Sequence, residues 1–209
     1  MIYSKFKYIF PPRPKNKIHP DFIKDYSNGR YLAQPKLNGS NCLIFTNGEK
    51  VHIMNRHNQR MSRFEIENIK NLHVGEKNSW IVLNGEYMNK NKKDENNKSF
   101  NHKFVIFDIL VYNNEYLLGS TFQQRIEILN QIYGEKEFDK YLYKITDNIY
   151  RVKSFKENID EIYSDLIAID MYEGLVIKRI NGKLKNGRTA MNNHNSQLKV
   201  RKPTKNYSF

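Results

Sequence analysis

Short apolar stretches separated by polar turns run through most of the chain, and their length and alternation are typical of β-strands. Asn47 and Gly48 stand between two of these stretches and are typical of a tight hairpin turn. The pattern predicts strands over residues 31–36, 42–46, 51–54, 80–88, 104–111, 174–177 and 197–201.

Helical spacing of apolar residues is less common along the chain. It predicts helices over residues 64–72, 121–133 and 157–169. Thr121 and Gln124 have the spacing of a capping box at the start of the second helix. Three prolines make residues 10–14 an extended lead-in, and the polar residues 89–101 predict an exposed loop. Many hairpins and few helices favour an α+β domain in which antiparallel sheets are flanked by helices.

The charge balance points to a polyanionic partner. The chain has 209 residues, enough for one domain with a sizeable core, and carries 35 Lys and Arg against 22 Asp and Glu, a formal net charge of +13. Residues 1–20 and 174–209 contain no Asp or Glu at all. Two basic ends are equally compatible with two faces of one groove and with two solvated tails.

Cysteine usage and hydropathy exclude several classes of protein. A single cysteine, Cys42, rules out an intramolecular disulfide framework and a cysteine-based zinc cluster. No apolar run approaches the roughly 20 residues that span a bilayer, and the N-terminus lacks the apolar core of a signal peptide. We therefore expect an intracellular, reducing location with no membrane partner.

Charged and aromatic side chains gather at the ends of the predicted strands. Lys36 ends the first strand and Gly39 follows three positions later, which lets the backbone approach a ligand closely, although this sequence is also ordinary at a strand-to-turn transition. Further along come Arg56, Glu86, Phe107, Glu173, Lys178, Lys199 and Arg201, each on a predicted strand or near its end.

These residue types together suit the transfer of a nucleotidyl group. A lysine amine attacks only when neutral, and neighbouring cations favour its neutral form. Cations and a metal stabilise charge that develops on a phosphoryl group, and a carboxylate must hold the metal. An aromatic ring such as Phe107 can stack on a base, although aromatic residues in apolar strands are more often plain core.

In this order the residues resemble the motifs of the covalent nucleotidyltransferases, the superfamily of ATP-dependent polynucleotide ligases and mRNA capping enzymes. The resemblance runs from about Gln34 to Lys202, which is nearly the whole chain. The matching segments are Lys36-Leu37-Asn38-Gly39, Arg56, Gly85-Glu86-Tyr87, Phe107 before Asp108, Glu173 to Lys178, and Lys199 with Arg201. The resemblance implies an adenylylation domain with a central nucleotide cleft.

The first motif distinguishes the branches of this superfamily. DNA ligases and capping enzymes usually carry Lys-x-Asp-Gly-x-Arg, whereas this chain has Asn38 in place of the aspartate and Asn41 in place of the arginine. Lysine followed by x-x-Gly-Ser/Thr-Asn is similar to the double-stranded-RNA ligases of phages and to RNA-editing ligases. The resemblance therefore implies an ATP-dependent RNA ligase that joins 5′-phosphate and 3′-hydroxyl ends, at nicks in duplex or structured RNA.

The same resemblance implies a role for each matching residue. Lys36 would attack ATP and carry the AMP, and Lys199 and Arg201 would neutralise the α-phosphate. Glu173 would bind or orient Mg²⁺ or Mn²⁺. The residues implied to contact the nucleotide are Asn38, Gly39, Asn41, Arg56, Glu86, Phe107 and Lys178.

Several alternatives stay open at this stage. A minimal ATP-dependent DNA ligase acting on DNA ends, a GTP-using capping-type enzyme and a catalytically silent nucleic-acid-binding domain all fit parts of the pattern. We expect residues 1–209 to form a single nucleotidyltransferase domain with no appended OB-fold or helical C-terminal domain. A partner protein would then supply what an appended domain provides in other branches.

Overall fold

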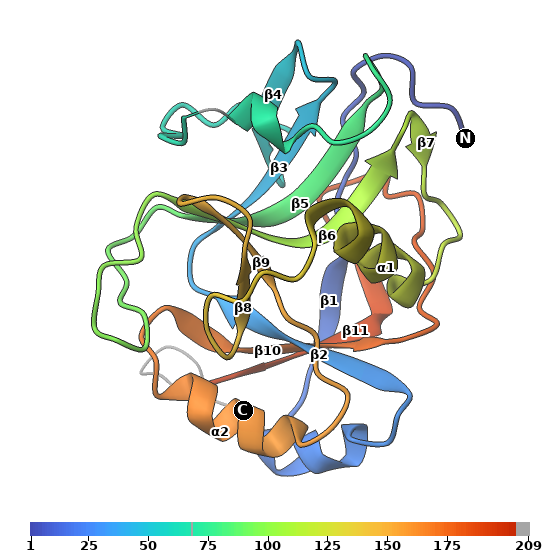
Figure 1. Cartoon of the computed structure of the whole chain (residues 1–209). Helices are drawn as coiled ribbons and strands as arrows, with labels where there is room; N and C mark the ends of the chain where they lie inside the picture. Colours follow the sequence, from blue (N-terminus) through green and yellow to red (C-terminus); the bar gives the residue numbers. More distant parts are fainter. Residues whose placement is uncertain (68, 204–209) are drawn as a thin grey trace.

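The computed structural model describes residues 1–67 and 69–203, and two β-sheets form its framework (Figure 1). The smaller sheet has four strands. In spatial order they are β1 (Arg13–Lys17), β11 (Asn193–Arg201), β10 (Tyr172–Arg179) and β2 (Tyr31–Leu37). Strand β1 lies parallel to β11, and the other pairs are antiparallel.

The larger sheet has seven strands. Its main path is β4 (Val51–Asn55), β3 (Ser40–Thr46), β5 (Ile81–Met88), β6 (Lys103–Tyr112), β9 (Ile149–Val152) and β8 (Leu142–Lys144). The short β7 (Glu115–Tyr116) pairs with β6. Strand β2 of the smaller sheet runs through the turn at residues 38–39 directly into β3 of the larger one, so a single turn links the two sheets.

Few helices accompany the sheets. Helix α1 (Phe122–Tyr133) packs against β6, and α2 (Ile159–Ile167) packs against β10 and a 3₁₀ helix, η1 (Pro20–Tyr26). Thr121 and Gln124 form a reciprocal capping box at the start of α1, which satisfies two backbone donors there. A second 3₁₀ helix, η2, covers Ile69–Leu72.

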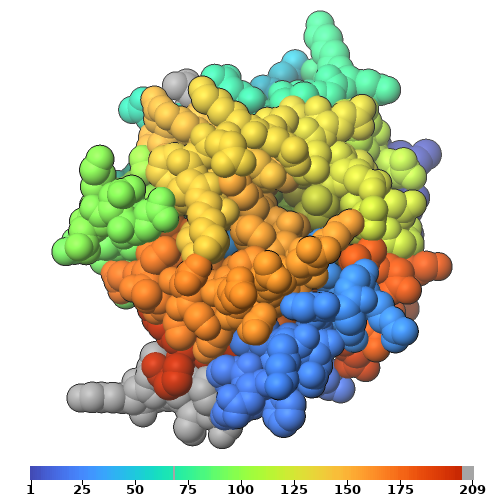
Figure 2. All heavy atoms as spheres, turned by 60° about the horizontal axis from the view of Figure 1, so that its bottom comes forward, coloured from blue at the N-terminus to red at the C-terminus, as the bar shows by residue number. Residues whose placement is uncertain are grey.

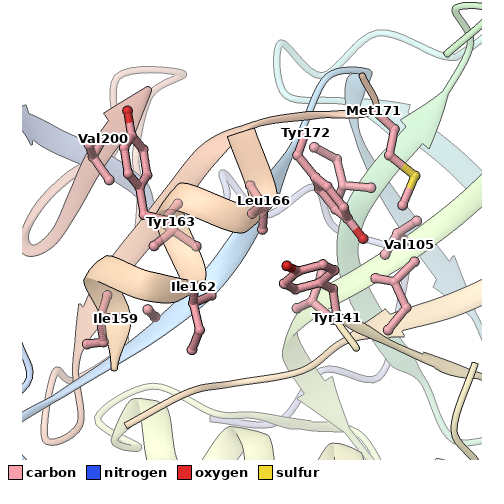
Figure 3. Packing of buried hydrophobic residues seen from close by; sticks show 14 of the residues in the cluster. Val105, Tyr141, Ile159, Ile162, Tyr163, Leu166, Met171, Tyr172 and Val200 are labelled. Carbon is pink, nitrogen blue, oxygen red and sulfur yellow. The ribbon is translucent and has the colours of Figure 1, made fainter. Parts of the chain in front are cut away.

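A hydrophobic cluster between α2 and the two sheets holds the parts together (Figure 3). This cluster includes Leu166 of α2, Tyr172 of β10 and Val105 of β6, all of them buried. Tyr163 of α2 also donates a hydrogen bond from its hydroxyl to the carbonyl of Arg201, 2.9 Å away. The end of β11 is therefore fixed from behind by buried side chains.

Most predicted elements are confirmed with small changes in their bounds. The strands β7, β8 and β9 and the 3₁₀ helix η1 were not predicted, and three further features differ. The predicted helix over 64–72 is wrong, because the described residues there form only η2; Phe64 and Ile66 are two positions apart, which does not fit a helical period. Residues 10–14 were expected only as an extended lead-in, whereas Arg13–Lys17 is the edge strand β1. Parallel pairs, β1 with β11 and β6 with β9, join the expected antiparallel ones.

The polar segment expected to be an exposed loop lies between β5 and β6 and projects from one side of the molecule, drawn in green (Figure 2). Among the described residues, no helix combines the length and the apolar character that crossing a membrane would need.

Candidate active site

A cleft of about 430 Å³ lies between the two sheets, and side chains from both line it. Ten of the eleven predicted site residues are among the lining residues: Lys36, Gly39, Asn41, Arg56, Glu86, Phe107, Glu173, Lys178, Lys199 and Arg201. Asn38 is the exception; it lies in the turn after β2, where its backbone N–H donates to the carbonyl of Met171 at 3.0 Å.

The turn that links the two sheets positions the first motif. Lys36 is the second-last residue of β2, and Gly39 follows in the turn, where the chain passes close to β5. A Cβ atom at Gly39 would lie 2.4 Å from the carbonyl oxygen of Tyr87, so no larger residue fits this approach. The backbone N–H of Gly39 donates to Glu86 at 3.2 Å. The glycine thus brings the lysine and the glutamate to the same cleft.

Lys36 is held in a charged cluster with Glu173 and Arg201. The Lys36 Nζ atom lies 2.5 Å from Glu173 Oε2, and Arg201 Nε lies 3.2 Å from the same oxygen. The Lys36 and Glu173 side chains are about one-fifth to one-quarter exposed, at 19% and 24%. The Lys36 ammonium, the Glu173 carboxylate and the Arg201 guanidinium therefore meet at one point of the cleft, and the ammonium is partly exposed to solvent.

A bulge in β10 turns Glu173 into this cluster. The pairing of β10 with β2 shifts between Tyr172 and Gly174, which leaves Glu173 as the extra residue. Gly174 has a φ of +143°, and a Cβ there would lie 2.1 Å from the carbonyl oxygen of Val200. Both the backbone angle and the lack of space therefore require glycine beside the carboxylate.

Further cations stand beside the cluster. Burial lowers the pKa of Lys199, and the neighbouring charges of Arg201, Arg13 and Lys36 lower it further. Arg13, from the edge strand β1, also lines the cleft and donates from Nη1 to the carbonyl of Ala190 at 3.0 Å. This wall of the cleft is strongly positive.

The larger sheet forms the opposite wall with amides and a carboxyl. Asn41 donates from Nδ2 to Asn84 Oδ1 at 2.9 Å and to the carbonyl of Gly85 at 3.1 Å, which leaves its own Oδ1 buried without a hydrogen-bond partner. Burial raises the pKa of Glu86 to about 7; Glu173 raises it further, whereas Lys36 opposes the shift. A ligand that donates hydrogen bonds or carries positive charge would satisfy both groups.

Phe107 reaches the same wall through another bulge. In the β5–β6 pair Asn84 lies opposite Asp108 and Gly85 lies opposite Ile106, so Phe107 is the unpaired extra residue. Its ring is partly buried and lines the cleft, with the Lys178 ammonium 5.3 Å from the ring centroid. The aromatic face thus lies beside a cation at the boundary between the two walls.

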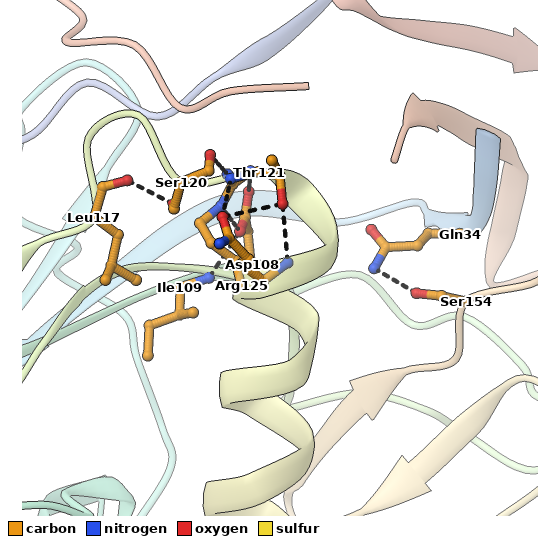
Figure 4. Close-up of polar contacts among 9 residues, drawn as sticks. Gln34, Asp108, Ile109, Leu117, Ser120, Thr121, Arg125 and Ser154 are labelled. Carbon is orange, nitrogen blue, oxygen red and sulfur yellow. Dashed lines mark hydrogen bonds and ion pairs between the residues drawn. The ribbon is translucent and has the colours of Figure 1, made fainter. Parts of the chain in front are cut away.

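A buried ion pair joins Arg125 to Asp108, the residue after Phe107 on β6 (Figure 4). Arg125 of α1 donates to both carboxylate oxygens of Asp108, from Nε at 2.7 Å and Nη2 at 3.1 Å, and also binds the carbonyl of Ser120. Burial lowers the pKa of Lys178 to about 8, with Arg125 adding to the shift and Asp108 opposing it. The ion pair therefore fixes the start of α1 against β6, next to the cleft.

Several lining residues were not among the predicted site residues, and the polar ones include Arg13, Gln34 and Asn84. Gln34 stands two positions before Lys36 on β2, and Asn84 two before Glu86 on β5, so strand alternation was a signal that could have found both. Arg13 carried no such signal, because its place depends on the parallel pairing of β1 with β11.

The donor set fits one kind of metal better than others. Within the described part of the chain, no three His, Cys, Asp or Glu side chains come together as a ready-made metal site. Glu173 and Glu86 nevertheless face one cleft closely enough for one charge to raise the pKa of the other. Mg²⁺ is commonly held by one or two carboxylates together with phosphate oxygens of the substrate, and this pair suits it.

The cleft has a cationic wall, an amide and aromatic wall and a lysine between them, an arrangement suited to a nucleotide. Residues 14–195 match the family model described as "ATP dependent DNA ligase domain", and the chain therefore belongs to this family. A search of curated proteins found no significant sequence match.

Solved structures of ligases share the fold. The chain is similar to mycobacterial DNA ligase D complexed with ATP, with 15% identity and a TM-score of 0.68 over 94% of this chain and 62% of that one. It is also similar to a Lig E DNA ligase (16% identity, TM-score 0.55, 93% and 70% covered) and to the Chlorella virus DNA ligase-adenylate (17%, 0.54, 91% and 68%). These likenesses confirm the expected nucleotidyltransferase fold, and the chain spans about three-fifths of the DNA ligase D structure.

Proposed function

We propose that the chain is the adenylylation domain of an ATP-dependent RNA ligase, with Lys36 as the residue that accepts AMP. The observation that carries this proposal is the cluster in which Lys36 Nζ lies 2.5 Å from Glu173 and beside Arg201, at the mouth of a nucleotide-sized cleft. Few other arrangements place a lysine, a carboxylate and several cations at one point.

In the first step the neutral Lys36 amine attacks the α-phosphorus of ATP, a phosphoramidate bond forms, and pyrophosphate leaves. Glu173 Oε2 lies within reach to accept the ammonium proton beforehand. Arg201 and Lys199 then favour the neutral amine and neutralise the charge that develops on the α-phosphate. A divalent cation held by Glu173 would add Lewis-acid stabilisation of that charge.

The later steps use the same cations for a second phosphate. The 5′-phosphate of a nucleic-acid end attacks the lysyl-adenylate, which frees Lys36 and leaves an AMP-capped end. A 3′-hydroxyl then attacks the capped phosphate, so that a phosphodiester bond forms and AMP leaves. Arg13 and Lys199, on neighbouring strands, extend the positive wall from the reacting lysine toward the incoming end.

The larger sheet is suited to the nucleoside part of ATP. We propose that Phe107 stacks on adenine, and that Glu86 and Arg56 hold the ribose and phosphate. The unpartnered oxygens of Gln34 and Asn41 supply buried acceptors for donors on the nucleotide. Asn38 contributes through the turn that it shapes rather than through the lining of the cleft.

RNA as the substrate rests on the first motif, where Asn38 and Asn41 stand in place of the aspartate and arginine usual in DNA ligases. The family model supports DNA as a second candidate. In either case the charge of +13 suits a polyanion, and A-form RNA would be contacted through phosphates and 2′-hydroxyls rather than base edges.

The first experiment is intact mass spectrometry after incubation with Mg²⁺ or Mn²⁺ and either ATP or GTP. We expect a gain of one AMP with ATP, its loss in Lys36→Ala, and its retention in Lys70→Ala, a control lysine on η2. Thermal unfolding checks that Lys36→Ala still folds. An adduct with GMP instead would indicate capping chemistry, and the absence of any adduct, even after pyrophosphate treatment to remove bound AMP, would leave a silent binding domain.

The second experiment separates RNA from DNA. Four nicked duplexes of one sequence are prepared, with RNA or DNA in each of the two strands that meet at the nick. The pre-adenylylated protein seals them under single-turnover conditions. We expect the fastest sealing where the 3′-hydroxyl strand is RNA. Equal rates on the all-DNA nick would favour the DNA-ligase candidate, and Asn41→Arg tests whether the first motif sets this preference.

A further inference from the structure

A second hollow, of about 580 Å³, lies outside the cleft on the smaller sheet. We name it the basic groove, and it is lined by Lys15, Arg179, Lys183, Lys185, Asn193, His194, Asn195 and Ser196. Its walls come from β1, from the end of β10, from the connection between β10 and β11, and from the start of β11. Four of its eight lining residues are cations, and no Asp or Glu lines it within the part of the chain that the structure describes.

The cations of the groove have no acidic partners of their own. Lys15, Lys183 and Lys185 are exposed, and among residues 1–67 and 69–203 none of them forms a salt bridge with an Asp or Glu. Arg179 donates to the Tyr31 hydroxyl at 3.3 Å, a neutral partner that leaves its charge uncompensated. The groove therefore holds a concentrated positive charge that an anion can neutralise.

The groove lies beside the cleft, with one small hollow between them that shares lining residues with both. This hollow is lined by Pro12, Lys178 and Gln197, which also line the cleft, and by Arg179, Lys183, His194 and Ser196, which also line the groove. Along β11 the alternate residues from Arg201 back to Asn193 lead from one to the other. The six residue steps along β11 from Lys199 to Asn193 span about 20 Å, on the order of six nucleotides of a duplex strand.

Hydrogen bonds hold the connection between β10 and β11 in place. On one side, Leu184 exchanges backbone hydrogen bonds with Ser120 and Gly119 just before α1, each at 2.9 Å. On the other side, Asn192 binds the N-terminal segment, donating from Nδ2 to the carbonyl of Phe10 and accepting from the N–H of Arg13, also at 2.9 Å. Because the wall is already ordered, less conformational entropy is lost when a ligand binds.

We propose that the basic groove binds the phosphodiester backbone of the nucleic-acid substrate several nucleotides from the end that reacts at Lys36. This inference rests on the proposed function, since it is the cleft that gives the strand its destination. Lysine, arginine and asparagine side chains donate to phosphate oxygens, and no aromatic residue other than His194 lines the groove among the described residues. The groove therefore recognises backbone rather than base sequence.

The test is a pair of double variants with the same change of charge. Lys183→Glu with Lys185→Glu reverses the groove, whereas Lys70→Glu with Lys77→Glu reverses two exposed lysines around η2, beside the other sheet. Affinity for a nicked RNA duplex and for its all-DNA counterpart is measured across a series of salt concentrations, and adduct formation with ATP is measured on the same preparations.

We expect the groove variant to lose about tenfold or more in affinity at low salt, and its plot of log affinity against log salt to be shallower by about two than that of the control variant. Adduct formation should be unchanged in both. Equal affinity and equal slope in the two variants would overturn the proposal, and so would a parent chain that binds neither duplex. If Lys183→Glu with Lys185→Glu fails to fold, the same variants with alanine decide the matter.

The failure of this inference differs from the failure of the proposed function. If the parent chain forms no lysyl-adenylate, but the groove variant binds the duplex more weakly than the parent, the proposed function is contradicted and the groove is supported. If the parent forms a normal adduct, but the change at Lys183 and Lys185 leaves its salt-dependent binding unaltered, the function is supported and the groove is contradicted.

Discussion

The two walls of the cleft differ in chemistry, although they meet at one turn. The smaller sheet contributes Arg13, Lys36, Lys178, Lys199 and Arg201, together with the carboxylate of Glu173. The larger sheet contributes Asn41, Asn84, Glu86, Phe107 and Asp108, with Arg56 just beyond the end of β4. The proposed function assigns the phosphates of a nucleotide to the first wall and its nucleoside to the second.

The difference extends to the titration of buried groups. On the cationic wall burial lowers the pKa of Lys178 and of Lys199, whereas on the opposite wall burial raises the pKa of Glu86. Each shift means that the folded protein holds a charged form less readily than water does. Burial of these groups in their charged forms therefore costs electrostatic free energy on both walls.

The largest effect is expected from removing a cation next to the reacting lysine. Arg201→Ala should slow adenylylation about 10²–10³-fold, since a group that stabilises developing phosphoryl charge contributes on that scale. Arg201→Lys keeps the charge but not the geometry and should recover part of the rate. Single-turnover adduct formation measures both rates. If the rate of Arg201→Ala is within a few-fold of the parent, Arg201 does not stabilise the charge that develops in this step.

Lys178 tests the stability of the same wall. Its pKa is about 8 in the folded chain and near 10.5 when unfolded, so the folded state binds fewer protons and gains stability as pH rises between these values. Lys178→Met should therefore be more stable than the parent by about 3 kcal/mol at pH below 8, with the difference shrinking toward pH 10.5. Denaturant unfolding of both proteins at several pH values measures it, and a difference that does not change with pH would contradict the prediction.

The opposite wall should respond with the opposite sign. Glu86 has a pKa of about 7 in the folded chain against about 4.5 unfolded, so the stability that its protonated form provides below pH 4.5 is lost as pH rises through 7. Glu86→Gln, which cannot ionise, should be more stable than the parent by about 3 kcal/mol at pH 8 and nearly equal to it at pH 4. The same unfolding series measures it, and equal stability of the two at pH 8 would show that Glu86 ionises freely.

The residues of the cleft were unequally predictable from the sequence. Motif residues on strands, such as Lys36, Glu86 and Lys199, could be named because the family resemblance points to them. The turn at Gly39 and the capping box at Thr121 have short-range causes and were readable as well. Arg13 was not, because the parallel pairing of β1 with β11 joins residues some 180 positions apart and leaves no local signal.

Bulges were a second limit to prediction. Alternation alone would not say whether Phe107 or its neighbours face the cleft, since the extra residue in β6 shifts the pattern by one. The same holds for Glu173, whose direction depends on Gly174 and its close approach to Val200. The family motif pointed to both residues where periodicity could not.

The smallest effect is expected at the aromatic ring between the walls. If Phe107 stacks on adenine, Phe107→Ala should raise the KM for ATP about tenfold, in line with about 1–3 kcal/mol for base stacking, and change kcat little. Phe107→Tyr keeps the ring and should keep the KM. The experiment separates stacking from a purely structural role, because a packing residue would lower stability in Phe107→Ala without a selective effect on KM. If the KM is unchanged but the unfolding temperature is lower, Phe107 serves packing alone. The nucleoside would then be bound on this wall by the amides and Glu86.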